Sequence, residues 1–236
     1  MMPTRRWHNG ADAQGMATEL SQAMQRICRK VIEEKGSVRF GLAGGSTPMA
    51  AYADFARAEL LWPQVHLALI DERNVPLDDS QSNEANIAQA FKNRRDQLGA
   101  WQGLFAEAKD LESMAEFSDG ALHEFGLPLD CAVIGMGADG HIASLFVESP
   151  DYEAAMQLGN PRAVLPIRFA PEAGKIDRLS FTLSTLLATR CVLFCINGAD
   201  KRDVLERSLD GRAPHYAAAR FLSAYPGPVD IFWSPA

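Results

Sequence analysis

"CAVIGMGADGHIASLF", residues 131–146, joins an apolar run to a turn of small residues that holds a single histidine. The pattern predicts a buried strand that ends at Ile134, a tight glycine turn, and a short helix that begins near Gly140. Asp139 suits the N-cap of that helix, because its carboxylate can accept hydrogen bonds from the free N–H groups of the first turn. His141 would then lie between the carboxyl end of a strand and the amino end of a helix, where ligands collect in open α/β sheets.

Strands and helices alternate along the rest of the chain. Buried strands are predicted within "SVRFGLAGGSTP" (37–48), "VHLALIDER" (65–73) and "RCVLFCIN" (190–197), and "RLSFTLSTLL" (178–187) reads as a strand that runs into a turn. Helices are predicted over residues 11–35, from about Pro48, over "SNEANIAQAF" (82–91) with a cap at Ser82 or Asn83, and after residue 198. This order predicts an α/β fold: a doubly wound, mainly parallel, Rossmann-like sheet with helices on both faces. We expect one domain over residues 1–236, with an irregular segment at 150–175 as a candidate lid, and residues 1–10 carry no interpretation.

The composition is that of an ordinary globular protein, with 47% hydrophobic and 22% charged residues among 236. A net charge of −7 argues against a nucleic-acid or membrane-surface partner, although donors within a cleft can still attract an anionic substrate. The N-terminus lacks the apolar region of a secretory signal, and no apolar run is long enough to span a bilayer. The oligomeric state stays open.

The cysteines and histidines show no spacing typical of a metal site. Buried thiols in a reduced, cytoplasmic setting are expected for the cysteines, which are Cys28, Cys131, Cys191 and Cys195. We therefore predict no metal site.

A glycine turn follows the strand in "GLAGGSTP". Its residues Gly44, Gly45, Ser46 and Thr47 lie at the start of a helix, where bare backbone permits close approach and N–H and hydroxyl donors favour an anion. The segment is neither a P-loop nor a nucleophile elbow, since no GK[ST] follows and Pro48 replaces the second glycine of G-x-S-x-G. A plain strand-to-helix turn is the alternative interpretation.

Charged residues follow two other predicted strands. Asp71 and Arg73, in "DER", come directly after an apolar run and would be costly to bury unless paired or bound to a ligand. Lys201, in "NGADK", falls in the first turn of a helix, where a bound anion would offset the unfavourable position of a cation. A solvated loop and an exposed lysine are the respective alternatives.

Together, the segments resemble the 6-phosphogluconolactonases of the glucosamine-6-phosphate isomerase/6-phosphogluconolactonase superfamily. The resemblance covers residues 36–235 and rests on "GLAGGSTP", "DERNVPLDDSQSN", "GMGADGHIASLF", "RLSFTLSTL" and "NGADK" in this order. It implies hydrolysis of 6-phospho-D-glucono-1,5-lactone to 6-phosphogluconate in the pentose phosphate pathway, without a cofactor.

The resemblance also implies a role for each candidate residue. His141 would be the base that activates water, oriented by Asp139 and kept neutral by a helix N-terminus, while Arg73 binds substrate or stabilises developing negative charge. Substrate and phosphate contacts would come from Gly44, Gly45, Ser46, Thr47, Asp71, Arg178 and Lys201.

Two other functions stay open. The deaminase and isomerase branch typically reads DGHIAFNEP, with a glutamate that assists its chemistry, whereas "DGHIASLF" follows the lactonase pattern. Val147 departs from that pattern, which usually has proline there, and Glu148 lies near the position of the isomerase glutamate. A sugar-phosphate isomerase or deaminase, with Asp71 moving a proton between C1 and C2, is therefore the second candidate. A non-catalytic sugar-phosphate sensor is the third, and such a module would be expected to lose its base.

Overall fold

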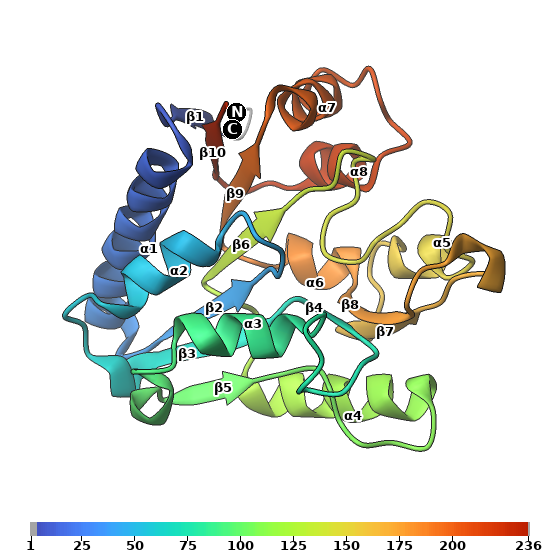
Figure 1. Ribbon diagram of the computed structural model, residues 1–236, viewed down its shortest axis with the longest axis horizontal. Coiled ribbons are helices and arrows are strands. Elements are labelled where there is room, and N and C mark those ends of the chain that lie inside the picture. The colour runs from blue at the N-terminus through green and yellow to red at the C-terminus, as the bar shows by residue number, and fades with distance from the viewer. Residues whose placement is uncertain (1–3, 236) are drawn as a thin grey trace.

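The computed structural model describes residues 4–235, and a seven-stranded parallel sheet forms its centre (Figure 1). The strand order is β1-β10-β9-β6-β2-β3-β5. The strands are β1 (Arg5–Asn9), β2 (Val38–Leu42), β3 (Val65–Leu69), β5 (Ala100–Gln102), β6 (Cys131–Gly135), β9 (Cys191–Asn197) and β10 (Val229–Ser234). The inner strands read as nearly continuous hydrophobic runs because helices cover both faces of the sheet. The predicted doubly wound, parallel α/β fold is confirmed.

Helices α1 (Ala13–Lys35), α2 (Met49–Ala56) and α3 (Asn83–Ala90) pack in a row on one face. The other face carries α4 (Leu111–Phe125), α6 (Leu183–Leu187) and α8 (Ala217–Ala224), and α7 (Ala199–Leu209) packs against α8. The predicted helix over residues 11–35 is α1, which begins after the capping side chain of Asp12 and ends at Gly36 in the left-handed conformation. Of the two predicted caps of α3, Ser82 is the one that caps it.

The order of the strands reverses between β2 and β6. From β2 the chain proceeds through α2 to β3, its neighbour on one side within the sheet. From β6 it proceeds to β9, which lies in the other direction along the strand order. The loops that leave these two strands therefore turn to opposite faces and open a crevice at the carboxyl ends, which is the usual ligand position in such sheets.

A second, three-stranded antiparallel sheet was not predicted. It has the order β4-β8-β7, formed by β4 (Asp71–Arg73), β8 (Arg178–Phe181) and β7 (Val164–Ile167). The single strand expected over 65–73 was wrong, because the chain changes partners at Ile70: its N–H donates to Leu42 of β2, and its carbonyl accepts from Phe181 of β8. Register then places Arg73 directly opposite Arg178.

The short helix expected from Gly140 is also wrong. Gly140 and Ala143 have φ values of 76° and 48°, both in the left-handed region, which no right-handed helix contains. Residues 137–141 instead form a tight turn, in which the N–H of Gly137 donates to the carbonyl of His141 at 3.0 Å. Asp139 is consequently not a helix cap.

Segments left uninterpreted or expected to be irregular contain regular structure. Residues 150–175 include α5 (Tyr152–Ala155), β7 and the 3-10 helix η3 (Pro171–Ala173). Strand β7 was not predicted because it contains Pro166, and proline argues against a strand. Its missing N–H is tolerated because β7 is an edge strand. Residues 5–9 form the edge strand β1, while residues 1–3 lie outside the described residues. One cluster of buried hydrophobic side chains runs through the molecule, and the single-domain organisation stays a prediction.

None of the helices within residues 4–235 has the length and apolar character that crossing a membrane requires.

Candidate active site

A cleft of about 230 Å³ lies at the carboxyl ends of β2, β6 and β9, at the reversal of strand order. Nine predicted site residues line it: Gly44, Gly45, Ser46, Thr47, Asp71, Arg73, His141, Arg178 and Lys201. The tenth, Asp139, lies next to His141 and contacts its ring. The fold thus brings together residues from four strand ends that are far apart in the sequence.

His141 is held by Asp139 within the turn that follows β6. Its Nδ1 lies 2.5 Å from Oδ1 of Asp139, and its backbone N–H donates to the same oxygen at 3.4 Å. Burial alone would raise the pKa of Asp139, but the hydrogen bond and charge of His141 lower this pKa to about 2. An ionised carboxylate requires a proton on Nδ1, so Nε2 remains as the acceptor of the neutral ring. The turn replaces the expected helix, and the helix-dipole argument for a neutral histidine therefore does not apply.

Phe146 stacks on the imidazole of His141, with ring centroids 3.9 Å apart. The same ring carries the guanidinium of Arg178 at 4.9 Å and the ammonium of Lys175 at 4.4 Å from its centroid. Phe146 is buried and stacks on the face of the histidine ring, whereas Asp139 contacts the ring edge at Nδ1. Sequence reasoning assigned it no role.

Two guanidinium groups enter the cleft from the second sheet. Arg73 donates from Nη1 to the carbonyl of Gln81 at 2.6 Å, and Arg178 approaches Oγ of Ser144 at 3.5 Å. Burial lowers the pKa of Arg178, an effect that the nearby Asp71 carboxylate opposes. The buried Nε atoms of both arginines have no hydrogen-bond partner among the described residues. Unpaired buried donors of this kind are suited to an anionic or oxygen-rich ligand.

The side chain of Asp71, the first residue of β4, is buried beside the segment that follows the histidine turn (residues 137–141). Its Oδ2 accepts a hydrogen bond of 2.7 Å from Ser144, whose own backbone N–H donates to Ser180 at 3.1 Å. Ser144, three residues beyond His141, was not predicted to belong to the site. It joins the turn to the second sheet and fixes the carboxylate of Asp71.

The glycine loop and Lys201 form the opposite side of the cleft. Gly45 has a φ of 83°, which favours glycine, and the Oγ1 of Thr47 donates to Asn197 at the end of β9 at 3.2 Å. Lys201 lies in the first turn of α7 and makes no ion pair within residues 4–235. The amino ends of α2 and α7 and the ammonium group of Lys201 thus lie at one cleft. Together they favour an anion there.

An aromatic clamp holds the start of α7. The guanidinium of Arg202 lies 5.0 Å from the ring centroid of Trp7 on β1 and 4.4 Å from that of Trp233 on β10. The indole N–H of Trp233 donates to the carbonyl of Gly198 at 2.9 Å. This clamp fixes the helix turn that carries Lys201, and its first member comes from the N-terminal segment that carried no interpretation.

Glu148 points to a different partner. It forms an ion pair with Lys175, and it does not line the cleft. Its pKa is lowered, because the hydrogen bond and charge of Lys175 outweigh the effect of its burial. The position that kept the isomerase interpretation open is therefore occupied by a paired surface carboxylate.

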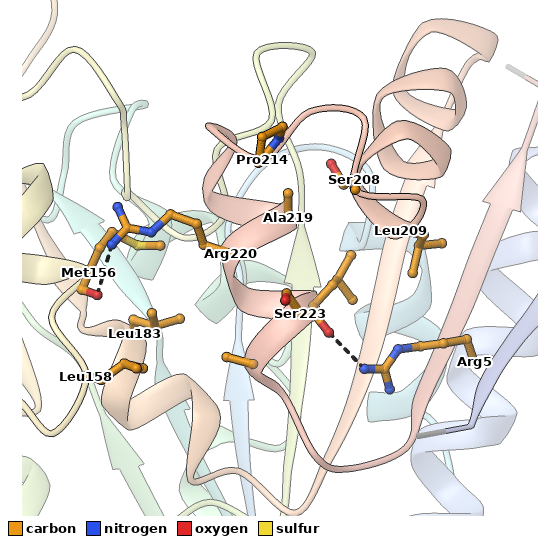
Figure 2. A pocket seen from close by; sticks show the side chains of 13 residues that line it. Arg5, Met156, Leu158, Leu183, Ser208, Leu209, Pro214, Ala219, Arg220 and Ser223 are labelled. Atoms are coloured by element: carbon orange, nitrogen blue, oxygen red, sulfur yellow. Dashed lines mark hydrogen bonds between the residues drawn. The ribbon is translucent and has the colours of Figure 1, made fainter. Parts of the chain in front are cut away.

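A larger cavity, of about 590 Å³, lies away from these residues on the outer face of α8 (Figure 2). Its wall is mostly apolar, with Arg5 and Arg220 at two sides. Both guanidinium groups are already occupied: Arg5 donates to the carbonyl of Leu222, and Arg220 donates to Met156 and pairs with Glu153. No predicted site residue lines this cavity, so the smaller cleft is the candidate active site despite its size.

Within residues 4–235, no group of three or more His, Cys, Asp or Glu side chains is arranged to hold a metal ion.

Comparison with known proteins identifies the family. Residues 11–232 match the family model described as glucosamine-6-phosphate isomerases/6-phosphogluconolactonase. The chain belongs to this family. A 6-phosphogluconolactonase of Pseudomonas putida is 34% identical over 97% of this chain and 92% of its own length, and one of Mesorhizobium japonicum is 30% identical over 97% and 95%. The crystal structure of a 6-phosphogluconolactonase from Shewanella baltica shares the fold, with a TM-score of 0.88 over 98% of this chain and 97% of that one at 24% identity. The family and the enzyme class predicted from the motifs are thus confirmed.

Proposed function

We propose that the chain hydrolyses 6-phospho-D-glucono-1,5-lactone to 6-phospho-D-gluconate, the lactone-opening step of the pentose phosphate pathway. The observation that carries this proposal is the contact between His141 and Asp139, which leaves one ring nitrogen as an acceptor. The cleft around it is lined by Arg73, Arg178 and Lys201, none of which forms an ion pair within residues 4–235. The names of the curated relatives support the same substrate.

His141 serves as the base in this proposal. Its Nε2 takes a proton from water while the water oxygen attacks the lactone carbonyl carbon, and the ionised Asp139 stabilises the imidazolium that forms. The tetrahedral intermediate then collapses, the bond between C1 and the ring oxygen breaks, and the imidazolium returns its proton to that oxygen. A lactone is an activated ester, so this sequence needs no covalent intermediate on the enzyme.

The cationic side chains of the cleft have separate roles in this proposal. Arg73 has a free Nε–H to stabilise the negative charge that develops on the carbonyl oxygen. Lys201 and the loop Gly44, Gly45, Ser46 and Thr47 bind the phosphate group. We assign Arg178 to the substrate as well, and its contacts with Phe146 and Ser144 place it on the side of the cleft nearer to His141.

The test is a pH-stat assay with freshly prepared 6-phosphogluconolactone, in which spontaneous hydrolysis is subtracted at every pH. We expect catalysed acid release by the parent protein and formation of 6-phosphogluconate as the product. A rate equal to spontaneous hydrolysis, together with ammonia release from glucosamine 6-phosphate, would overturn the proposal in favour of the deaminase reaction. Binding of sugar phosphates without either reaction would instead identify the sensor.

A further inference from the structure

The side chain of Asn83 holds a buried acceptor in the wall of the cleft that is unpaired within residues 4–235. Asn83 is 1% exposed and lines the cleft, yet its Oδ1 has no hydrogen-bond partner within the described part of the chain. Buried polar atoms are almost always paired, so an orphan in a candidate active site points to a group supplied by a ligand. The predicted site did not include Asn83, which was considered only as a helix cap.

The orientation of this amide is determined by its surroundings. Its Nδ2 donates to the backbone carbonyl of Asp71 at 3.0 Å, and its backbone N–H donates to Oε1 of Glu72 at 2.7 Å. Rotating the amide would place its oxygen against the Asp71 carbonyl, and two acceptors cannot bond to each other. Oδ1 is therefore the atom that remains free.

The glycine loop is shaped around the same oxygen. A Cβ atom at Gly44 would lie only 1.9 Å from Oδ1 of Asn83, so a larger residue there would displace the amide. The acceptor consequently lies at the base of the loop, between Gly44 and Asp71.

We propose that Oδ1 of Asn83 accepts a hydrogen bond from a ring hydroxyl of the sugar lactone, which makes Asn83 a specificity-determining residue. This inference rests on the proposed function. A hydroxyl fits because it donates a proton, whereas a phosphate group would bring its own oxygens against Oδ1 and against the neighbouring Asp71 carboxylate. The phosphate is thereby directed to the other side of the cleft, where Lys201 lies.

The experiment compares Asn83→Ala with Asn86→Ala, a matched change on the same helix. Asn86 is exposed, does not line the cleft, and donates to the carbonyls of Ser80 and Ser82. Substrates are the complete 6-phosphogluconolactone and its 2-deoxy, 3-deoxy and 4-deoxy analogues, each corrected for spontaneous hydrolysis. Asn83→Ala is expected to lower kcat/KM on the complete lactone about tenfold, the size of one hydrogen bond, while Asn86→Ala leaves it unchanged.

The deoxy analogues distinguish a direct hydrogen bond between Asn83 and the substrate from a role of Asn83 in supporting the site. With one of the three deoxy lactones, parent and Asn83→Ala should show the same kcat/KM, because the donor is already missing. An equal loss on all four substrates would mean that Asn83 only supports Asp71 and the loop, and no loss on the complete lactone would mean that no contact exists. Either result overturns the inference. If Asn83→Ala does not fold, as judged by circular dichroism, Asn83→Ser is the replacement, since it also removes the amide oxygen but keeps a polar side chain.

Failure of the proposed function can be distinguished from failure of the inference about Asn83. If the parent protein does not hydrolyse the lactone, the same comparison is made by calorimetric binding of 6-phosphogluconate and its deoxy forms. Asn83→Ala should then bind 6-phosphogluconate about tenfold more weakly than the parent, and this difference should disappear with one deoxy form. That result would support the hydroxyl contact even without lactonase activity.

Discussion

At the scale of single residues, the contact between Asp139 and His141 determines which ring nitrogen can act as a base. Because the pKa of Asp139 is about 2, its carboxylate stays ionised near neutral pH, where activity is measured. Asparagine at position 139 can donate to Nδ1 as well as accept from it, so the ring would lose its fixed tautomer. We expect Asp139→Asn and His141→Asn each to lower kcat about 10²- to 10⁴-fold with little change in KM.

The double variant provides the check on this pair. If Asp139 acts through His141, Asp139→Asn should add little to the loss already caused by His141→Asn. Multiplied losses would show that the carboxylate contributes to the reaction independently of the ring.

The same pKa shift has a consequence for stability. A carboxylate whose folded pKa lies below its ordinary value of 3.8 stabilises the fold above that value and loses the effect as pH falls toward 2. Asp139→Asn is therefore expected to lower the Tm at pH 6, and the difference from the parent should shrink between pH 4 and pH 2. A difference that grows on acidification would contradict the direction of the shift.

Ala143 holds a backbone conformation that alanine rarely adopts, with a φ of 48° between His141 and the buried Ser144. For a residue with a Cβ atom, this conformation costs about 1 kcal/mol or more, and glycine relieves the cost. Ala143→Gly should thus leave the free energy of unfolding unchanged or raise it by up to about 1 kcal/mol. Ala88→Gly, inside helix α3, is the control and should lower it by about 1 kcal/mol. Equal losses in chemical denaturation would mean that no strain is stored at position 143.

At the scale of elements, Glu72 joins strand β4 to helix α3. Its two oxygens accept hydrogen bonds from the backbone N–H groups of Arg73, Asn83 and Glu84 and from the hydroxyl of Ser82. Burial raises the pKa of Glu72, while these backbone donors oppose the shift. All four partners donate, so the carboxylate form satisfies them and the start of α3 together.

Glutamine at position 72 would turn one acceptor into a donor that faces other donors. We expect Glu72→Gln to lower the free energy of unfolding by about 2–3 kcal/mol, the effect of leaving buried donors unpaired. Asp110→Asn, at the exposed cap of α4, is the control and should cost only a few tenths, because asparagine caps as well as aspartate. The measurement is urea denaturation of both variants, and similar small losses would show that Glu72 is not required at this junction.

Elements whose signal is local were predictable. The runs that form β2, β6 and β9 are largely apolar and are followed by glycine turns, so both the parallel sheet and the residues at the strand ends could be predicted from them. Strands β4 and β7 carry three charges and a proline respectively, and they become strands only through pairing with β8. Tertiary pairing overrides local pattern there.

The same limit applies within the site. His141, Arg73 and Lys201 could be found because each lies within a few residues after an apolar run and has its own chemistry. Ser144 and Asn83 could not, because their roles depend on contacts with Asp71, which lies 73 residues from Ser144 and 12 from Asn83. The helix expected at Gly140 failed because two residues there adopt left-handed backbone, which composition does not reveal.

At the scale of the whole molecule, the cleft combines two structural units: the carboxyl edge of the large sheet and the small sheet beside it. Lys201 belongs to the first unit, whereas Arg73 and Arg178 belong to the second. Lys201→Ala should therefore weaken substrate binding, raising KM by about 10- to 100-fold through loss of a charge-assisted bond worth roughly 1.5–3 kcal/mol, with a smaller effect on kcat.

Unphosphorylated gluconolactone tests whether this effect depends on the phosphate. On this substrate Lys201→Ala and the parent should behave alike, and the surface change Lys92→Ala should be silent on both lactones. Equal losses of activity on the two substrates would mean that Lys201 contacts the lactone group or stabilises the fold, and does not bind the phosphate.

The pairing of β1 with β10 also governs the order in which the molecule can be completed during synthesis. Arg5 leaves the ribosome 224 residues before Val229, its partner in the sheet, so the first strand to be made has no neighbour until the last strand has emerged. Trp7 and Trp233 then close together on Arg202, beside Lys201. A nascent chain that stops short of residue 229 already contains the residues of the histidine turn and the glycine loop, yet it lacks Trp233 and therefore the clamp that fixes Lys201. Capture of phosphorylated substrate should accordingly arise at the end of translation, when the two ends of the sheet meet.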